Sequence, residues 1–167
     1  MLDKKLIEAY TNTQYIVESP VVNIKIGNKC PDVDRLMVEK GLTDWAFITA
    51  HNPKSKQLMD ELNEDLHRNL VNSTSNYICH EGYGKGEDDG WKPEVSILVL
   101  GISKEEAKAI GEIFDQNAIV VGSLNSKAKL LIIDLKNKPY RGGIDEYYES
   151  KCVSPKESID VDLEKNK

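Results

Sequence analysis

The sequence predicts a single domain of the α/β or α+β class, in which helices pack on one mixed β-sheet. Its 167 residues suffice for one buried core and are too few for two. A hydrophobic content of 40% with 30% charged residues is typical of globular proteins. Apolar spacing alternates between helical and strand periods in the order helix, strand, strand, helix, strand, helix, strand, strand, helix, strand, strand. We place the domain at residues 1–138 and expect residues 139–167 to form a charged, partly disordered extension.

The first third of the chain predicts two short helices around a β-hairpin. "DKKLIEAYTNT" has apolar residues at near-helical spacing, and Asp3 is suited to cap its start. The hairpin consists of "QYIVE" and "VVNIKIG", which flank Ser19-Pro20. In "PDVDRLMVEKG", Pro31 opens the second helix and Gly41 stands where it would stop.

The middle of the chain predicts a buried strand that runs directly into a long amphipathic helix. "DWAFITAHNPKS" is densely apolar up to Asn52-Pro53, and leucines then recur every fourth residue, at positions 58, 62, 66 and 70. Asn52 is suited to the N-cap position and Pro53 to the first helical turn.

The last third predicts four strands and one helix. "NYICHEGYGKGEDDGW" begins as a strand and continues as a loop rich in glycine and acids. "EVSILVLGI" has apolar residues at both odd and even positions, so both faces of the strand would be buried, as in a central strand. Ser103 followed by Glu106 is a capping box that opens the next helix, and "NAIVVG" and "AKLLIIDL" predict the final strands.

Composition excludes several functional classes. A net charge of −6, with lysines interspersed among acids, argues against a nucleic-acid partner. The longest apolar runs are well below the roughly 18 residues of a membrane span, and charges interrupt the amino-terminal segment, so we expect a cytoplasmic protein. Cys30, Cys79 and Cys152 form no CxxC pair, which indicates reduced structural thiols, with Cys79 expected to be buried.

The junction "TAHNPKS" has two interpretations. One is an ordinary helix start. The other is an anion site lined by Thr49, His51, Asn52 and Ser55, because free N–H groups at a helix start favour phosphate or carboxylate.

The helix after this junction carries a polar row. Asn63 and His67 lie four residues apart at the border of the leucine stripe, and Arg68 follows. These side chains would face either a pocket or solvent.

The loop before the central strand carries no metal or nucleotide signature. Its glycines do not match GxGxxG or a P-loop, its adjacent acids are expected to be solvated, and the three histidines form no HxxxH pair, so we predict no metal and no cofactor. Trp91, Glu94 and Ser96 flank the entry to the strand. An acid entering a buried strand needs a partner or a proton, so Glu94 is a candidate general base, a ligand-binding acceptor or a partner for a lysine.

Two carboxamides, Gln116 and Asn117, follow Phe114 between the last predicted helix and a strand. They can close the helix and bind a neighbouring strand, or they can contact a ligand. No Ser-His-Asp set or nucleophile elbow is recognisable.

The set "AYTNTQY", "WAFITAHNPKS", "GWKPEVSILVLGI" and "IFDQNAIVVG" resembles a widespread bacterial domain-of-unknown-function family with the patterns AFxTAxNPxS, WxxEPSxLVxGI and FGQNAxV. The resemblance covers about residues 6–133. Val95 replaces the family's proline and Asp115 its glycine, and Asp tolerates positive φ less readily. The polar positions that the resemblance implies are Tyr10, Thr13, Tyr15, Thr49, Asn52, Ser55, Asn63, Arg68, Trp91, Glu94, Ser96, Gln116 and Asn117.

The sequence supports three functional hypotheses. The leading one is a small-molecule binding domain for a nucleotide-like or other anionic metabolite. In it Asn52, Ser55 and Arg68 hold the anion, Gln116 and Asn117 read polar edges, and Tyr10 or Trp91 stacks on a base. The second is a hydrolase or transferase with Glu94 as general base. The third is a protein-interaction or inhibitor module that uses Tyr147 and Tyr148, and a homo-oligomer also remains open.

Overall fold

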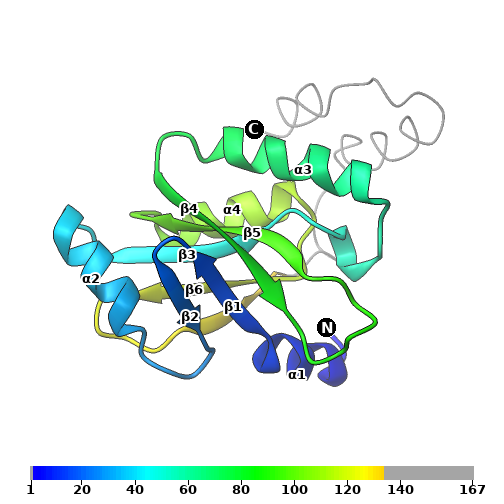
Figure 1. The fold of residues 1–167 in the computed structure, drawn as a ribbon, viewed down its shortest axis with the longest axis horizontal. Helices are drawn as coiled ribbons and strands as arrows, with labels where there is room; N and C mark the ends of the chain where they lie inside the picture. Colours follow the sequence, from blue (N-terminus) through cyan, green and yellow to red (C-terminus); the bar gives the residue numbers. More distant parts are fainter. Residues whose placement is uncertain (1, 134–167) are drawn as a thin grey trace.

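A computed structural model describes residues 2–133 and contains one seven-stranded sheet with helices on both faces (Figure 1). The predicted fold class and the predicted order of elements are confirmed. The helices are α1 (Lys4–Asn12), α2 (Pro31–Lys40), α3 (Asp60–Ser73) and α4 (Lys104–Ile113), with one 3₁₀ turn, η1 (Pro53–Ser55). The strands are β1 (Gln14–Glu18), β2 (Val21–Ile24), β3 (Asp44–Thr49), β4 (Ile78–Lys85), β5 (Glu94–Leu100), β6 (Ala118–Ser123) and β7 (Lys129–Ile132).

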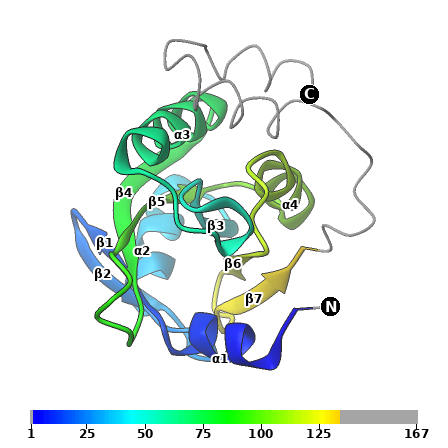
Figure 2. The same cartoon turned by 90° about the vertical axis from the view of Figure 1, so that its right-hand side faces the viewer.

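The strands lie in the order β2-β1-β4-β5-β3-β6-β7. All neighbouring pairs among them are antiparallel, so the sheet is antiparallel and not mixed as predicted, and of the two predicted classes α+β describes the domain. The sheet is curled, and α1 lies between the β1–β2 hairpin and β7 (Figure 2). As predicted, β5 is a central strand, buried on both faces from Ser96 to Leu100.

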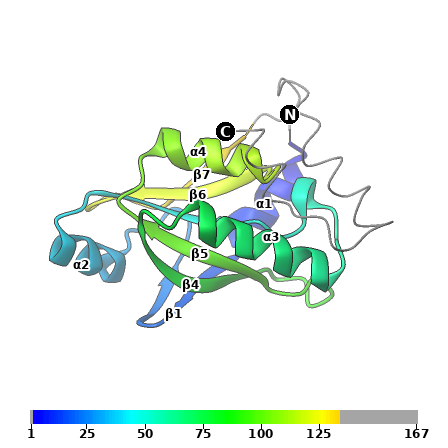
Figure 3. The same cartoon turned by 90° about the horizontal axis from the view of Figure 1, so that it is seen from above.

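Each face of the sheet has its own core. Leu62, Leu66 and Leu70 of α3 pack with α4 against one face, which confirms the predicted leucine stripe. On the opposite, concave face, Val33 and Met37 of α2 pack against residues such as Trp45 and Phe47. α2 and α1 lie at opposite ends of the molecule (Figure 3). The concave face is therefore covered by α2 at one end and by α1 at the other.

The predicted helix start at Asn52 is wrong. α3 begins at Asp60, and its N-cap residue is Met59; Pro53–Ser55 form only a single 3₁₀ turn. Asn52 has a φ of 48° and makes no capping hydrogen bond, because its side chain bonds to other partners in the site. Acidic residues in the first turn of α3 already complement its dipole. The junction after β3 therefore presents no free helix N-terminus to an anion.

The other capping predictions are confirmed. Ser103 Oγ accepts a hydrogen bond from the Glu106 N–H at 3.1 Å, which starts α4. Gly41 ends α2 with a φ of 68°, a conformation that glycine adopts at little cost. None of the helices within residues 2–133 is long and apolar enough to cross a membrane.

Two further predictions concern the cysteines and the chain end. Cys30 is buried, whereas Cys79 is exposed, contrary to expectation, because it lies at the start of β4 beside the connection from α3. Cys152, the predicted boundary at residue 138 and the predicted extension, residues 139–167, lie outside the described residues.

Candidate functional site: the α1 cavity

A cavity of about 500 Å³ lies on the concave face, where α1 covers the end of the sheet. We call it the α1 cavity. Its aromatic lining comes from Tyr10, Tyr15, Phe47 and Trp91. Its polar lining includes six of the predicted site residues besides Tyr10 and Trp91: Thr49, Asn52, Ser55, Glu94, Ser96 and Gln116.

Glycines of β4 leave the concave face hollow at this point. Gly84 lies between Tyr15 of β1 and Glu94 of β5, and a Cβ there would be 3.6 Å from its nearest neighbour, in Thr13. At Gly82, a Cβ would lie 2.3 Å from the Ile16 carbonyl oxygen, so only glycine fits. The segment predicted to become a loop is thus strand as far as Lys85. Its glycines accommodate the cavity and the β1 backbone.

Asn52 is the centre of a buried hydrogen-bond network. The Asn52 backbone N–H donates to Asn63 Oδ1, and Asn63 Nδ2 donates to Asn52 Oδ1, both at 2.9 Å. Asn52 Oδ1 also accepts from the Leu58 N–H at 2.9 Å. Asn52 Nδ2 then donates to Glu94 Oε2 at 2.7 Å. Asn63 is therefore a buried residue whose two hydrogen bonds hold Asn52 in position, and it is not part of a solvated polar face.

Glu94 brings its carboxylate to the α1 cavity from the first position of β5. Oε2 accepts a second, longer hydrogen bond from Trp91 Nε1 at 3.4 Å. Burial raises the pKa of Glu94 above its ordinary value, although the hydrogen bonds from Asn52 and Trp91 oppose this shift. Within residues 2–133, no lysine or arginine forms an ion pair with it. The predicted alternative of a lysine partner is therefore wrong for the described part of the chain.

Hydrogen bonds that involve side-chain hydroxyl groups connect α1 to the rest of the site. Tyr10 Oη lies 2.7 Å from Ser55 Oγ, which also accepts from Asn117 Nδ2 at 2.9 Å. The Tyr15 hydroxyl donates to the Tyr10 carbonyl oxygen at 2.5 Å. Burial raises the pKa of the Tyr10 phenol, so it is a neutral hydrogen-bonding group at physiological pH. None of the residues of α1 is fully buried, and these bonds add to the contacts that attach the helix to the sheet.

The turn before Gln116 joins two loops. Asp115 has a φ of 52°, so it adopts the left-handed conformation. Its carbonyl oxygen accepts from the Lys54 N–H at 2.7 Å. Gln116 Nε2 donates to the carbonyl oxygens of His51 and Phe114, at 3.1 and 3.3 Å. Gln116 therefore both closes the end of α4 and lines the cavity.

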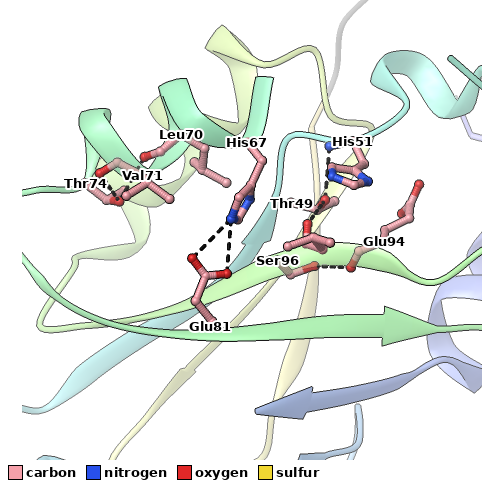
Figure 4. A network of polar contacts seen from close by, with 10 residues as sticks. Thr49, His51, His67, Leu70, Val71, Thr74, Glu81, Glu94 and Ser96 are labelled. Carbon is pink, nitrogen blue, oxygen red and sulfur yellow. Dashed lines mark hydrogen bonds and ion pairs between the residues drawn. The ribbon is translucent and has the colours of Figure 1, made fainter. Parts of the chain in front are cut away.

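Thr49 and Ser96, paired across β3 and β5, bond mainly to backbone (Figure 4). Thr49 Oγ1 donates to the Val95 carbonyl at 2.7 Å and accepts from the His51 N–H, while Ser96 Oγ donates to the Glu94 carbonyl. These bonds hold the end of β3, from which the next loop continues, and the start of β5, which carries Glu94.

The structure does not bring Arg68 to the α1 cavity. Arg68 is exposed on α3 and forms an ion pair with Asp65, one turn earlier. It lies one position beyond His67, whose Nε2 reaches Glu81 Oε2 of β4 at 3.1 Å (Figure 4). The His51 ring meets the His67 ring edge-on, and burial, then the nearby His67, lowers the pKa of His51 to about 4. The predicted contribution of Arg68 to anion binding is therefore not supported.

Sequence reasoning missed Phe47 and the β4 glycines as parts of the site. Phe47 follows the same alternation as Trp45 and Thr49, but a densely apolar strand does not show which set faces a cavity. Glycines at alternate positions of a strand were the available signal for a hollow in the sheet.

Among the described residues, no group of three or more His, Cys, Asp or Glu side chains is arranged to hold a metal ion. No curated protein and no solved structure matches the chain. One family model does match, and it supports the resemblance to a domain-of-unknown-function family. Its description is "protein of unknown function" (DUF3293), and it matches residues 48–119, the segment that supplies Asn52, Ser55, Asn63, Glu94 and Gln116.

Proposed function

We propose that this domain binds a small molecule in the α1 cavity, and that the ligand is nucleotide-like. The observation that carries the proposal is the convergence on one cavity of polar residues from α1, β3, β5 and the loop after α4. A volume of about 500 Å³ is in the range of ligand pockets, which usually combine apolar walls with a few fixed polar groups.

The lining suits the planar part of such a ligand. Tyr10 and Trp91 supply aromatic side chains, and Glu94 and Gln116 supply hydrogen-bonding groups held in place by their own partners. The anchors expected for an anionic group, a helix start at Asn52 and Arg68, lie elsewhere. Lys5 is the one cation among the described lining residues, so an anionic group of the ligand would be placed beside α1. A cytoplasmic location belongs to the same proposal.

The proposal is tested by mass spectrometry of small molecules released from protein purified without denaturation. A cavity-filling variant, Gly84→Leu, should lose the released metabolite, since the new side chain enters the α1 cavity. Lys85→Leu, at the next and exposed position of β4, is the matched control and should retain it. The same metabolite at equal occupancy in the Gly84 variant would place binding elsewhere.

An enzyme is the second candidate, and the environment of Glu94 favours it. A desolvated carboxylate with a raised pKa, held by two donors at a cavity, has the properties of a general base. If Glu94 acts as the base on the released metabolite, Glu94→Gln should abolish turnover even when the metabolite is supplied at a saturating concentration. Turnover that survives this substitution would rule out that role.

A further inference from the structure

We infer that the ligand presents to Glu94 a planar edge with two adjacent N–H donors, as in a guanidinium, an amidinium or a 2-aminopyrimidine ring. This inference rests on the proposed function and names the chemistry that the α1 cavity selects. It follows from the position, the partners and the surroundings of one carboxylate.

The Glu94 carboxylate is fixed but only partly used. Oε2 accepts from Asn52 Nδ2 and, at longer range, from Trp91 Nε1, whereas Oε1 accepts no hydrogen bond from residues 2–133. Asn52 is itself held by Asn63 and by the Leu58 N–H, so the carboxylate cannot easily turn away. Because Oε1 has both of its lone-pair positions available and the Trp91 bond to Oε2 is long, at 3.4 Å, the carboxylate can still accept two parallel N–H bonds from a ligand, one on each oxygen.

The charges at the α1 cavity favour a donor-rich ligand. Its described lining contains four acids and one cation: Glu8, Glu87, Asp88 and Glu94, against Lys5. The donors that Glu94 does have, Asn52 and Trp91, are neutral. A carboxylate removed from water without a cationic partner is costly, and a ligand that supplies positively polarised N–H groups offsets that cost.

The aromatic lining matches the same class of ligand. Trp91 belongs to the loop that leads into β5, and Tyr10 approaches from α1, so aromatic side chains from two separate elements line the cavity that Glu94 enters. Guanidinium groups and aminated rings are planar and stack on aromatic faces. A flexible alkyl acid or a simple phosphate would use neither the carboxylate nor these rings.

The test compares ligands that differ in the donor edge. Calorimetric titrations would use guanosine against inosine, which lacks the 2-amino group, and agmatine against butylamine, which lacks the guanidinium group. We expect guanosine or agmatine to bind at least ten-fold more tightly than its matched partner. Guanosine alone would identify a base as the source of the donor edge, and agmatine alone a guanidino compound.

The variant Glu94→Gln should weaken this binding roughly 10- to 100-fold, because a carboxamide cannot accept both bonds and charge-assisted hydrogen bonds are strong. Glu81→Gln is the control, since Glu81 bears the same charge on β4 but contacts His67 outside the α1 cavity. A circular-dichroism melt verifies that each variant is folded.

Three results would overturn the inference. These are equal affinity for the members of each pair, an unchanged affinity in Glu94→Gln, or no binding of either donor-bearing probe. If a released metabolite without a donor edge is found, the proposed function survives and only the inference fails. If nothing is released and no probe binds, both fail.

Discussion

Replacing Asn63 by leucine tests whether the network around Asn52 stabilises the domain. The substitution keeps a side chain of similar size but removes the two bonds that Asn63 exchanges with Asn52, each at 2.9 Å. It also leaves the Asn52 N–H, in a residue only 7% exposed, without its partner. The lost bond from Asn63 Nδ2, at about 1 kcal/mol, and the buried orphan N–H, at about 1–3 kcal/mol, suggest a net loss of roughly 2–4 kcal/mol.

The same helix supplies a matched control. Asn69 is as buried as Asn63, but within residues 2–133 its Nδ2 bonds only to the Asp65 carbonyl of the same helix, and its buried Oδ1 has no partner there. Asn69→Leu removes that unsatisfied atom and should be neutral or stabilising. Urea denaturation and thermal melts measure both, and Asn63→Leu should lower Tm by roughly 4–16 °C at about 2–4 °C per kcal/mol. Equal effects of the two substitutions would refute the special role of the Asn52–Asn63 pair.

Three other predictions follow from burial and close contact. The pKa of His51 falls from 6.5 to about 4 on folding, so the folded chain binds fewer protons at this residue than the unfolded chain does. The contribution of neutral His51 to the free energy of unfolding is therefore full above about pH 6.5 and is lost as pH falls towards 4. Urea denaturation at a series of pH values should show this loss of stability for the parent chain and not for His51→Gln. The pH dependence from Glu94 has the opposite sign, because a carboxyl group with a raised pKa lowers the free energy of unfolding as pH rises. Glu94→Gln should therefore raise Tm at pH 7 and not at pH 4. A lower Tm at pH 7 would contradict this. Gly122→Ala would place a Cβ 2.3 Å from the Trp45 ring and should cost more than 2 kcal/mol in urea denaturation, whereas Gly41→Ala, which has open space, should cost about 1 kcal/mol for its positive φ.

The order of the elements was predictable because it depends on local patterns. The leucine stripe of α3, the capping box of α4 and the glycine at the end of α2 each act over one or two helical turns. The prediction failed where a local pattern has two solutions. "NPKS" fits a helix start, but the chain adopts left-handed residues there because Asn52 gains partners on α3 and β5.

Membership of the candidate site was partly predictable for a different reason. Asn52, Glu94 and Gln116 stand at the ends of strands or helices, where polar groups in α/β and α+β domains often meet. The sequence could not exclude Arg68 from the site. A helical residue next to a histidine at the border of the buried face can point to either side, and only the position of the neighbouring strand decides which.

By itself, the sequence determined the fold class, the element order and most of the polar residues that meet at the α1 cavity, because periodicity and capping are properties of short segments. The tertiary structure decided the antiparallel strand order, the hollow above Gly84 and the pairing of Glu94 with Asn52, residues 42 positions apart. These depend on which strands lie side by side and on how far the sheet curls, and both are set by packing of the whole core rather than by any one stretch of chain.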